Sequence, residues 1–312
     1  MTRRVVVDTD TGIDDALALM VLAAQPDVEL VAVGTTHGNC ATERSTANAR
    51  RVLEVLGLGG VPVVGGLSAP LAGDLDVAWF IHGHDGLGDC GLAPEPAAAA
   101  PAGDTAVELY LRLAAEQPGA LDLLALGPLT NLGAALRVEP DLLTAFRSVT
   151  IMGGAGRRVG PGEADPTLGI GDPNTHHDAA AARLVAAAPG DVTLVGIDVT
   201  IGCVAPPELL DRIAAADSEH GRFADRMTRF YVDAYESRYG ERRLTLHDPL
   251  TAMVAVGLDV GARFVEGPTA VEGAAGRERV VLVGPGEGGP SRRVLAGADV
   301  GRTAAWMAEA LR

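Results

Sequence analysis

The fold is decided by the stretch Val5-Val6-Val7-Asp8-Thr9-Asp10-Thr11-Gly12-Ile13-Asp14-Asp15 near the N-terminus. Its apolar run, Val5–Val7, is typical of a short strand buried on both faces of a parallel sheet. The residues that follow, Asp15–Ala24, predict a helix for which Asp14 is the N-cap. A buried strand that leads into a helix through a polar turn is the first β–α unit expected of an α/β protein.

The same alternation of strand and helix patterns continues along the chain. Helices are predicted over residues 42–56, 104–117, 129–137 and 178–188, over most of 207–239, and from about Pro249. Strands are predicted over residues 28–36, 61–64, 121–126, 148–152 and 192–196, and near Ala270 and Val280. We therefore predict one α/β domain over residues 1–312, with a mostly parallel central sheet, helices on both faces and a Rossmann-like arrangement. Two Gly- and Pro-rich stretches, 91–103 and 153–174, are predicted to be loops.

Composition excludes several classes of partner and mechanism. The 312 residues carry a net charge of −16, which disfavours binding to nucleic acids or to anionic membrane surfaces. All basic residues are arginines, so Schiff-base chemistry and a Walker-type phosphate loop, which both need a lysine, are excluded. The three cysteines are far apart, and neither an export signal nor a membrane span is recognisable. We expect a cytoplasmic protein with reduced thiols.

Polar and Gly-rich residues gather where the predicted strands end. The first strand ends in the acidic run 8–15, and the second in Thr35-Thr36-His37-Gly38-Asn39. Two later strands end in Leu126-Gly127-Pro128 and in Met152-Gly153-Gly154. Ligands of open parallel sheets bind beyond the carboxyl ends of the strands, so we expect these segments to meet at one site.

The four acids Asp8, Asp10, Asp14 and Asp15 are the strongest chemical signal in the sequence. Crowded carboxylates on a partly buried rim repel one another, and a hard cation such as Ca²⁺, which prefers oxygen ligands, would relieve that repulsion. No Cys/His cluster has zinc spacing, and an EF-hand loop that starts at Asp8 would need a glutamate where Leu19 stands. The alternative is that Asp14 caps a helix, Asp8 faces a turn and the other acids are solvated.

Five motifs, in the same order along the chain, resemble those of the inosine–uridine-preferring nucleoside hydrolases. They accompany the acidic run and are Gly38-Asn39, 82–88 (His-Gly-His-Asp-Gly-Leu-Gly), 127–131 (Gly-Pro-Leu-Thr-Asn), 152–154 (Met-Gly-Gly) and 247–250 (His-Asp-Pro-Leu). The resemblance implies hydrolysis of the N-glycosidic bond of ribonucleosides in purine or pyrimidine salvage, one bound Ca²⁺, and a homodimer or homotetramer.

The resemblance also implies roles for individual residues around the ion and the ribose. Asp10, Asp15, Asp248 and the backbone carbonyl of Leu126 would hold the Ca²⁺, and Asp10 would act as the general base on metal-bound water. Negative charge beneath the ring would stabilise a ribosyl cation. The ribose would be bound by Asp14, Asn39, Asp172 and Asn174, with Asp172 accepting a hydrogen bond from the 5′-hydroxyl, and Met152 would also contact the substrate. Asp172-Pro173-Asn174 departs from the family's Glu-Phe-Asn, which affects the preference for 5′-substituents.

Side chains that would contact the nucleobase are expected from three segments of the chain. His247 resembles the histidine that protonates the departing base, and an ordinary pKa near 6.5 suits that task. Its neighbour Asp248 is alternatively a simple helix N-cap, and His82 is either a base contact or a solvated turn residue. Tyr231 and Tyr235 share one face of a predicted helix, either as core packing or as a stacking surface for the base.

Two alternatives from other functional classes remain at this point. The run Val5–Asp10 is also similar to the nucleophile strand of haloacid-dehalogenase-type phosphatases, although the missing lysine and the acid pair Asp14-Asp15 count against that family. A nucleoside- or sugar-binding protein without turnover would use the same pocket. An assay of ribose and phosphate release separates the three.

Overall fold

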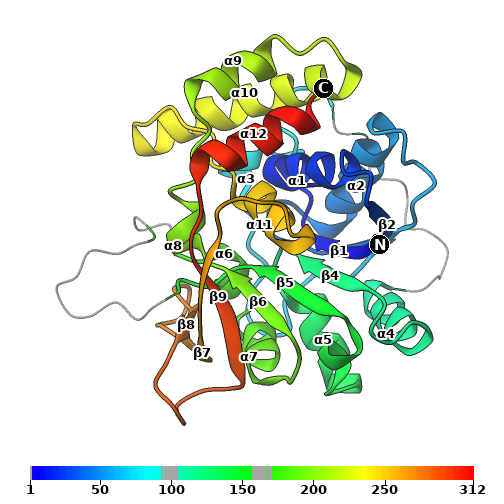
Figure 1. The fold of residues 1–312 in the computed structure, drawn as a ribbon, viewed down its shortest axis with the longest axis vertical. Coiled ribbons are helices and arrows are strands. Elements are labelled where there is room, and N and C mark those ends of the chain that lie inside the picture. Colours follow the sequence, from blue (N-terminus) through cyan, green and yellow to red (C-terminus); the bar gives the residue numbers. More distant parts are fainter. Residues whose placement is uncertain (1, 93, 95–104, 157–166, 168–170) are drawn as a thin grey trace.

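The predicted α/β class with a mostly parallel sheet is confirmed. The computed structural model describes residues 2–92, 94, 105–156, 167 and 171–312, so most of the predicted loops 91–103 and 153–174 lies outside the described residues. Within those ranges a nine-stranded sheet has the order β3-β2-β1-β4-β5-β6-β9-β7-β8 (Figure 1). The strands are β1 Arg3–Thr9, β2 Val28–Thr35, β3 Val63–Gly65, β4 Asp122–Ala125, β5 Ser148–Met152, β6 Val192–Val195, β7 Arg263–Glu272, β8 Arg279–Leu282 and β9 Ser291–Gly297.

Neighbouring strands from β3 to β9 in this order run parallel, whereas β7 and β8 extend the edge as antiparallel strands. The sequence did not predict β9. Arg292 and Arg293 interrupt the apolar pattern expected of a buried strand. The Arg292 side chain is nevertheless buried and donates hydrogen bonds to the carbonyls of Gly190 and Val185. An apolar run is therefore not required where an arginine finds carbonyl partners inside the protein.

Helices cover both faces of the sheet. Figure 1 shows α1 Ile13–Ala23, α2 Thr42–Val55, α10 Glu219–Tyr239, α11 His247–Val256 and α12 Val300–Ala310 on one side, and α4 Ala106–Glu116, α5 Thr130–Val138 and α7 Ala179–Ala187 on the other. The alternating side chains of β1 explain why both layers are needed. Val5 and Val7 belong to the core beneath α1 and α11, and Val6 belongs to the core beneath α4 and α5. Within the described ranges, no helix combines the length and the apolar character that a bilayer span needs.

Shorter elements complete the chain between these helices. They are α3 Trp79–His82, the 3₁₀ helix Leu142–Ala145, α6 Pro173–His176, α8 Ile197–Thr200 and α9 Pro207–Ala214. Helix α1 begins earlier than predicted, because its N-cap is Gly12 and not Asp14. The Asp15 carboxylate, in the third helical position, reaches back and accepts a hydrogen bond from the N–H of the Gly12 cap at 2.9 Å.

The strand order fixes where a ligand can bind. β1 pairs with β2 on one side and with β4 on the other, so the chain reverses its direction of progress through the sheet at β1. Such a switch point leaves a crevice beyond the carboxyl ends of the strands. Asp8 pairs in register with both Gly34 and Ala125, so the acidic run, the Asn39 segment and Leu126 all emerge at the same level of the sheet.

Candidate active site

A cavity of about 280 Å³ opens at this switch point. Its lining comes from the first turn of α1, from the segments that follow β2 and β4, from the end of β5, and from α3, α6, α8, α10 and α11. Most of the predicted site residues line it: Asp14, Asn39, His82, Leu126, Met152, Asn174, Tyr231, Tyr235, His247 and Asp248. The predicted residues Asp10 and Asp15 lie just beneath that lining, where Asn39 binds both.

Asn39 connects the acids of the cavity floor. Its backbone N–H donates to Asp10 Oδ2 at 2.7 Å, and its side-chain amide donates to Asp15 Oδ2 at 2.8 Å. Carboxylate oxygens of Asp14, Asp15 and Asp248 lie within 4.8 Å of one another. Residues more than 230 positions apart in the sequence thus form one acidic group, which we call the carboxylate floor: Asp10, Asp14, Asp15 and Asp248.

The carboxylate floor is buried, so the interpretation that its acids are solvated is wrong. Asp10, Asp14 and Asp248 are between 2% and 6% exposed, and Asp15 is fully buried. Burial and repulsion from Asp15 raise the pKa of Asp14 to about 8. Burial and repulsion from Asp15 likewise raise the pKa of Asp10 well above the ordinary range, and burial with repulsion from Asp14 does the same to the pKa of Asp248.

The donor atoms of this floor fit a hard cation. Asp10 Oδ1 and Asp14 Oδ1 are buried and accept no hydrogen bond from the described residues. Buried carboxylate oxygens are normally paired, and a Ca²⁺ ion takes six to eight oxygen ligands of this kind. The Leu126 carbonyl is at the same place, where it accepts a hydrogen bond from the side-chain amide of Asn174.

Asp8, the first acid of the run, faces away from the cavity. It accepts a hydrogen bond from Asn131 Nδ2 at 3.0 Å, and burial raises its pKa to about 7. It points to the same side of β1 as Val6, toward the core beneath α4 and α5. A phosphatase nucleophile at Asp8 would have to reach a ligand in the cavity, and this geometry disfavours that alternative.

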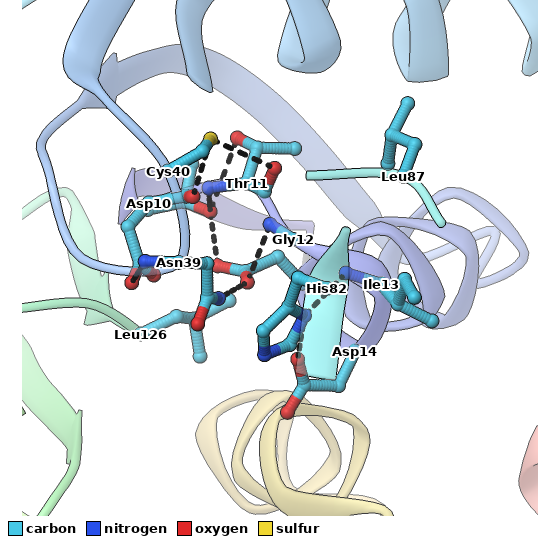
Figure 2. Close-up of polar contacts among 12 residues, drawn as sticks. Asp10, Thr11, Gly12, Ile13, Asp14, Asn39, Cys40, His82, Leu87 and Leu126 are labelled. Atoms are coloured by element: carbon cyan, nitrogen blue, oxygen red, sulfur yellow. Dashed lines mark hydrogen bonds and ion pairs between the residues drawn. The ribbon is translucent and has the colours of Figure 1, made fainter. Parts of the chain in front are cut away.

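Two buried histidines face the carboxylate floor. His82 Nδ1 accepts the backbone N–H of Ile13 at 3.1 Å and lies 3.8 Å from Asp14 Oδ1, and Figure 2 shows these two side chains pointing toward each other. His247 Nδ1 pairs with the Thr200 hydroxyl at 2.7 Å. The interpretation of His82 as a solvated turn residue is wrong, because only 6% of it is exposed.

Burial changes the chemistry expected of these histidines. It lowers the pKa of His82 and that of His247 to about 3, with His247 contributing at His82 and Arg243 contributing at His247. The ordinary pKa expected for His247 is therefore wrong, and both rings are neutral at pH 7. A His247 ring whose Nδ1 accepts from the Thr200 hydroxyl would carry its single proton on Nε2. Asp248 is not the N-cap of α11, because that position is Leu246.

Helix α10 forms one wall of the cavity with its predicted tyrosine face. Tyr231 and Tyr235 stack with ring centroids 4.9 Å apart, and Tyr239 follows at 5.1 Å from Tyr235. The His82 ring meets Tyr231 edge-on at 5.9 Å. Tyr231 and Tyr235 are both buried in the core and part of the cavity lining, so the two interpretations of this stripe hold together.

The predicted ribose contact at Asp172 finds other partners. Its carboxylate accepts hydrogen bonds from the Gly154 N–H at 2.7 Å and from the N–H and hydroxyl of Thr175, and it caps α6. Asp172 is 1% exposed and is absent from the described lining of the cavity, whereas Asn174 is present. Proline at 173 starts α6 directly after Asp172, which explains why this carboxylate turns back into the protein.

Other lining residues escaped the sequence analysis. The segment Asp76–Ala78 and residues Phe80 and Ile81 come from the approach to α3 and from α3 itself, and Ile197, His176, His177 and Arg238 complete the wall. Tyr239, which continues the repeat of Tyr231 and Tyr235, also lines the cavity. The Arg238 guanidinium lies 4.1 Å from the centre of the Phe80 ring, which joins α10 to α3 at the cavity. Residues 76–81 have no periodic pattern, so only their adjacency to the His82 motif could have indicated them.

Comparison with known proteins agrees with this site. Residues 5–305 match the sequence model of the family described as "Inosine-uridine preferring nucleoside hydrolase". The chain is 34% identical over 254 residues to "Probable uridine nucleosidase 2" of Oryza sativa subsp. japonica, covering 80% of this chain and 74% of the relative. It is 32% identical over 288 residues to "Inosine-uridine preferring nucleoside hydrolase" of Leishmania major, covering 87% and 88%.

A solved structure extends the likeness to the whole fold. "Purine-Preferring Ribonucleoside Hydrolase from Gardnerella vaginalis" is 27% identical, with a TM-score of 0.87 over 99% of this chain and 98% of that one. The resemblance of the motifs is confirmed, because the family match spans nearly the entire chain. The chain therefore belongs to the inosine-uridine preferring nucleoside hydrolase family, the members of which are hydrolases of the N-glycosidic bond.

Proposed function

We propose that this protein hydrolyses ribonucleosides to free base and ribose and that it depends on Ca²⁺. The observation that carries the proposal is the buried carboxylate floor, which lies beneath a cavity lined by histidines and tyrosines. A neutral nucleoside suits this cavity, because it offers hydroxyls to the acids and an aromatic base to the tyrosines. The mostly acidic surface adds no attraction for an anion.

Asp10, Asp15, Asp248 and the Leu126 carbonyl would hold the calcium ion. Asp14 belongs to the same carboxylate group but points toward His82 and the open cavity, which suits a contact to a ribose hydroxyl. When bound, calcium would balance the charge of these acids and make a coordinated water more acidic. The unpaired, buried Asp10 Oδ1 supports this assignment, because a cation with its coordinated water gives that atom a partner, and the unpaired Asp14 Oδ1 is left for a ribose hydroxyl.

Asp10 is suited to the role of general base. Its Oδ2 is fixed by the Asn39 N–H, so the orientation of the carboxylate is set and Oδ1 remains available for a proton. A base also has to take up a proton near neutral pH, and burial together with Asp15 raises the pKa of Asp10 in that direction.

The residues around the ribose favour the charge that develops as the bond breaks. N-glycosidic cleavage leaves positive charge on the sugar, and Asp10, Asp14 and Asp15 lie beneath the position of the ring. His247 can donate its Nε2 proton to the departing base as a neutral imidazole. Tyr231 and Tyr235 would contact the base from α10.

Ribose and phosphate release from three substrates tests the proposal. The purified protein is given inosine, uridine and a phosphomonoester in the presence of Ca²⁺ and, separately, with excess chelator. Ribose release that the chelator abolishes is the expected result. Phosphate release without ribose would support the phosphatase alternative, and binding of nucleosides without either product would support a binding protein.

A further inference from the structure

We propose that His176 and His177 form a subsite for the 5′ end of the ribose, where they bind a neutral hydroxyl in place of the Asp172 carboxylate. The inference rests on the proposed hydrolysis of ribonucleosides and names residues that decide which sugars are accepted. Both histidines lie where α6 passes into α7, and both line the cavity beside Asn174.

The order of residues around the cavity supports this placement. Residues 76–82 run along its wall, with Asp76 in electrostatic contact with His177 at one end and His82 against Tyr231 at the other. The base is assigned to the tyrosine end, and the ribose diol is assigned to the carboxylate floor. The 5′ carbon of a nucleoside lies across the ribose ring from the base, so the histidine end is the part of the lining left for it.

Both imidazoles have an unused polar atom. The Nδ1 atoms of His176 and His177 are buried, and neither makes a hydrogen bond to a described residue, although the two rings pack edge to face at 4.8 Å. A buried polar atom without a partner is unfavourable, and a ligand hydroxyl relieves that cost. His177 is also neutral at pH 7, because burial lowers its pKa to about 4, and a neutral imidazole can accept or donate.

Charge in the cavity selects a hydroxyl over a phosphate. Asp14, Asp76 and Asp248 belong to the same lining, and the buried Asp172 carboxyl group interacts electrostatically with His176. Arg238, a cation of the lining, is held over the Phe80 ring. A 5′-phosphate at the histidine end would therefore meet the neutral His177 ring and nearby acids, whereas a hydroxyl can pair with either imidazole.

The test compares a nucleoside with its 5′-deoxy analogue. We measure kcat/KM for uridine and 5′-deoxyuridine with the natural protein, with His176→Phe, with His177→Phe and with the double variant. Phenylalanine keeps the ring but removes its hydrogen bonds. The natural protein should prefer uridine by at least about tenfold, since a site built to bind a hydroxyl rejects a substrate that lacks it. The double variant should lose most of that preference through slower turnover of uridine alone.

Three further variants separate binding from folding. His177→Asn keeps a hydrogen-bonding group and should retain part of the preference. His220→Phe changes a similarly half-buried histidine outside the cavity and should leave both rates unchanged. Asp172→Asn removes a cap within the protein and should lower both rates by the same factor.

The outcomes also distinguish this inference from the proposed function. An unchanged preference in the folded double variant overturns the subsite, as does a natural protein that uses both substrates equally. A loss of preference in Asp172→Asn with none in the histidine variants would return the 5′ contact to Asp172. If the natural protein releases no ribose from either substrate, the proposed function fails as well.

Discussion

The carboxylate floor and the helical walls of the cavity are built in different ways. The floor comes from the segment after β1 and from the first turns of α1 and α11. Its Asp10 and Asp15 side chains are fixed by hydrogen bonds from backbone N–H groups and from Asn39. The walls come from α3, α6 and α10, and ring stacking and the Arg238–Phe80 contact hold them. The floor is thus suited to chemistry common to all substrates, and the walls are suited to choosing among them.

Replacing Asp10 tests this division with the largest expected effect. Asp10→Ala should lower kcat by about a thousandfold or more for every nucleoside, because it removes both the base and a proposed metal ligand. The variant should still fold, since one buried, repelling carboxylate is removed. The readouts are kcat on inosine and uridine and the thermal midpoint without calcium. Near-natural kcat would remove Asp10 from the mechanism.

His247→Ala sharpens the comparison, because His247 lies between the floor and the walls. It should lower kcat roughly a hundredfold for inosine or uridine, where the base must be protonated as it leaves. A nitrophenyl riboside needs no such proton and should lose far less. Equal losses on both kinds of substrate would show that His247 acts through packing around Thr200 and not as an acid.

The protonation state of His247 provides a second check of the same role. Because its pKa is lowered to about 3, the ring stays a neutral donor from pH 8 down to about pH 4. The pH profile of kcat on inosine should therefore show no step near pH 6.5 that depends on His247. A step near pH 6.5 that is present in the natural protein and absent from His247→Ala would show that the imidazolium is the acid.

The floor was predictable from sequence because its information is local. A buried apolar run that ends in crowded acids identifies β1 and its polar end, and five motifs in family order supplied Asn39, Leu126 and Asp248. Even so, the predicted N-cap at Asp14 was wrong. The helix begins after Gly12, where the Asp15 carboxylate turns back to the Gly12 N–H, and the sequence does not show which way that carboxylate turns. Burial also moved the pKa of His247, which no local pattern reveals.

The walls were predictable only where they share a periodic pattern. Tyr231 and Tyr235 follow the helical repeat of α10, whereas residues 76–81 have no repeat and reach the cavity through the tertiary fold. Asp172 illustrates the same limit. Its residue type fits a hydroxyl acceptor, but Pro173 starts a helix at once and the carboxylate caps it. Whether a side chain faces a ligand or its own backbone depends on the neighbours that the fold brings.

Shortening a wall tyrosine should have a smaller effect that depends on the base. Tyr235→Ala removes a ring of the proposed base contact and should raise KM by roughly tenfold, with a modest change in kcat, since stacking on a base is worth about 1–3 kcal/mol. Tyr235→Phe keeps the ring and should retain most of the affinity. The measurement is KM for inosine and for uridine. An equal loss of kcat for all substrates would assign Tyr235 to the machinery of the floor.

The smallest expected effect concerns the floor alone and is a change in stability with pH. The pKa of Asp14 is about 8 in the folded protein and near 3.8 when it is unfolded, so without calcium the folded state binds more protons. Stability then falls as pH rises toward 8, by about 1 kcal/mol between pH 7 and 8 for one such group. His82 and His247, with lowered pKa values, lose stability only below about pH 6.5, outside this window.

Thermal midpoints at pH 7.0 and 8.0, with chelator and with calcium, measure this effect. With chelator the midpoint should fall by a few degrees from pH 7 to 8, since 1 kcal/mol corresponds to roughly 2–4 °C in a protein of this size. Asp14→Asn should reduce the fall, because it removes one raised carboxyl group and lessens the repulsion on Asp10 and Asp248, and His220→Phe should keep it. Calcium should abolish the fall, because a bound cation favours the charged carboxylates. A midpoint that falls equally with and without calcium would mean that the floor does not hold the ion, and the contrast between floor and walls would then rest on packing alone.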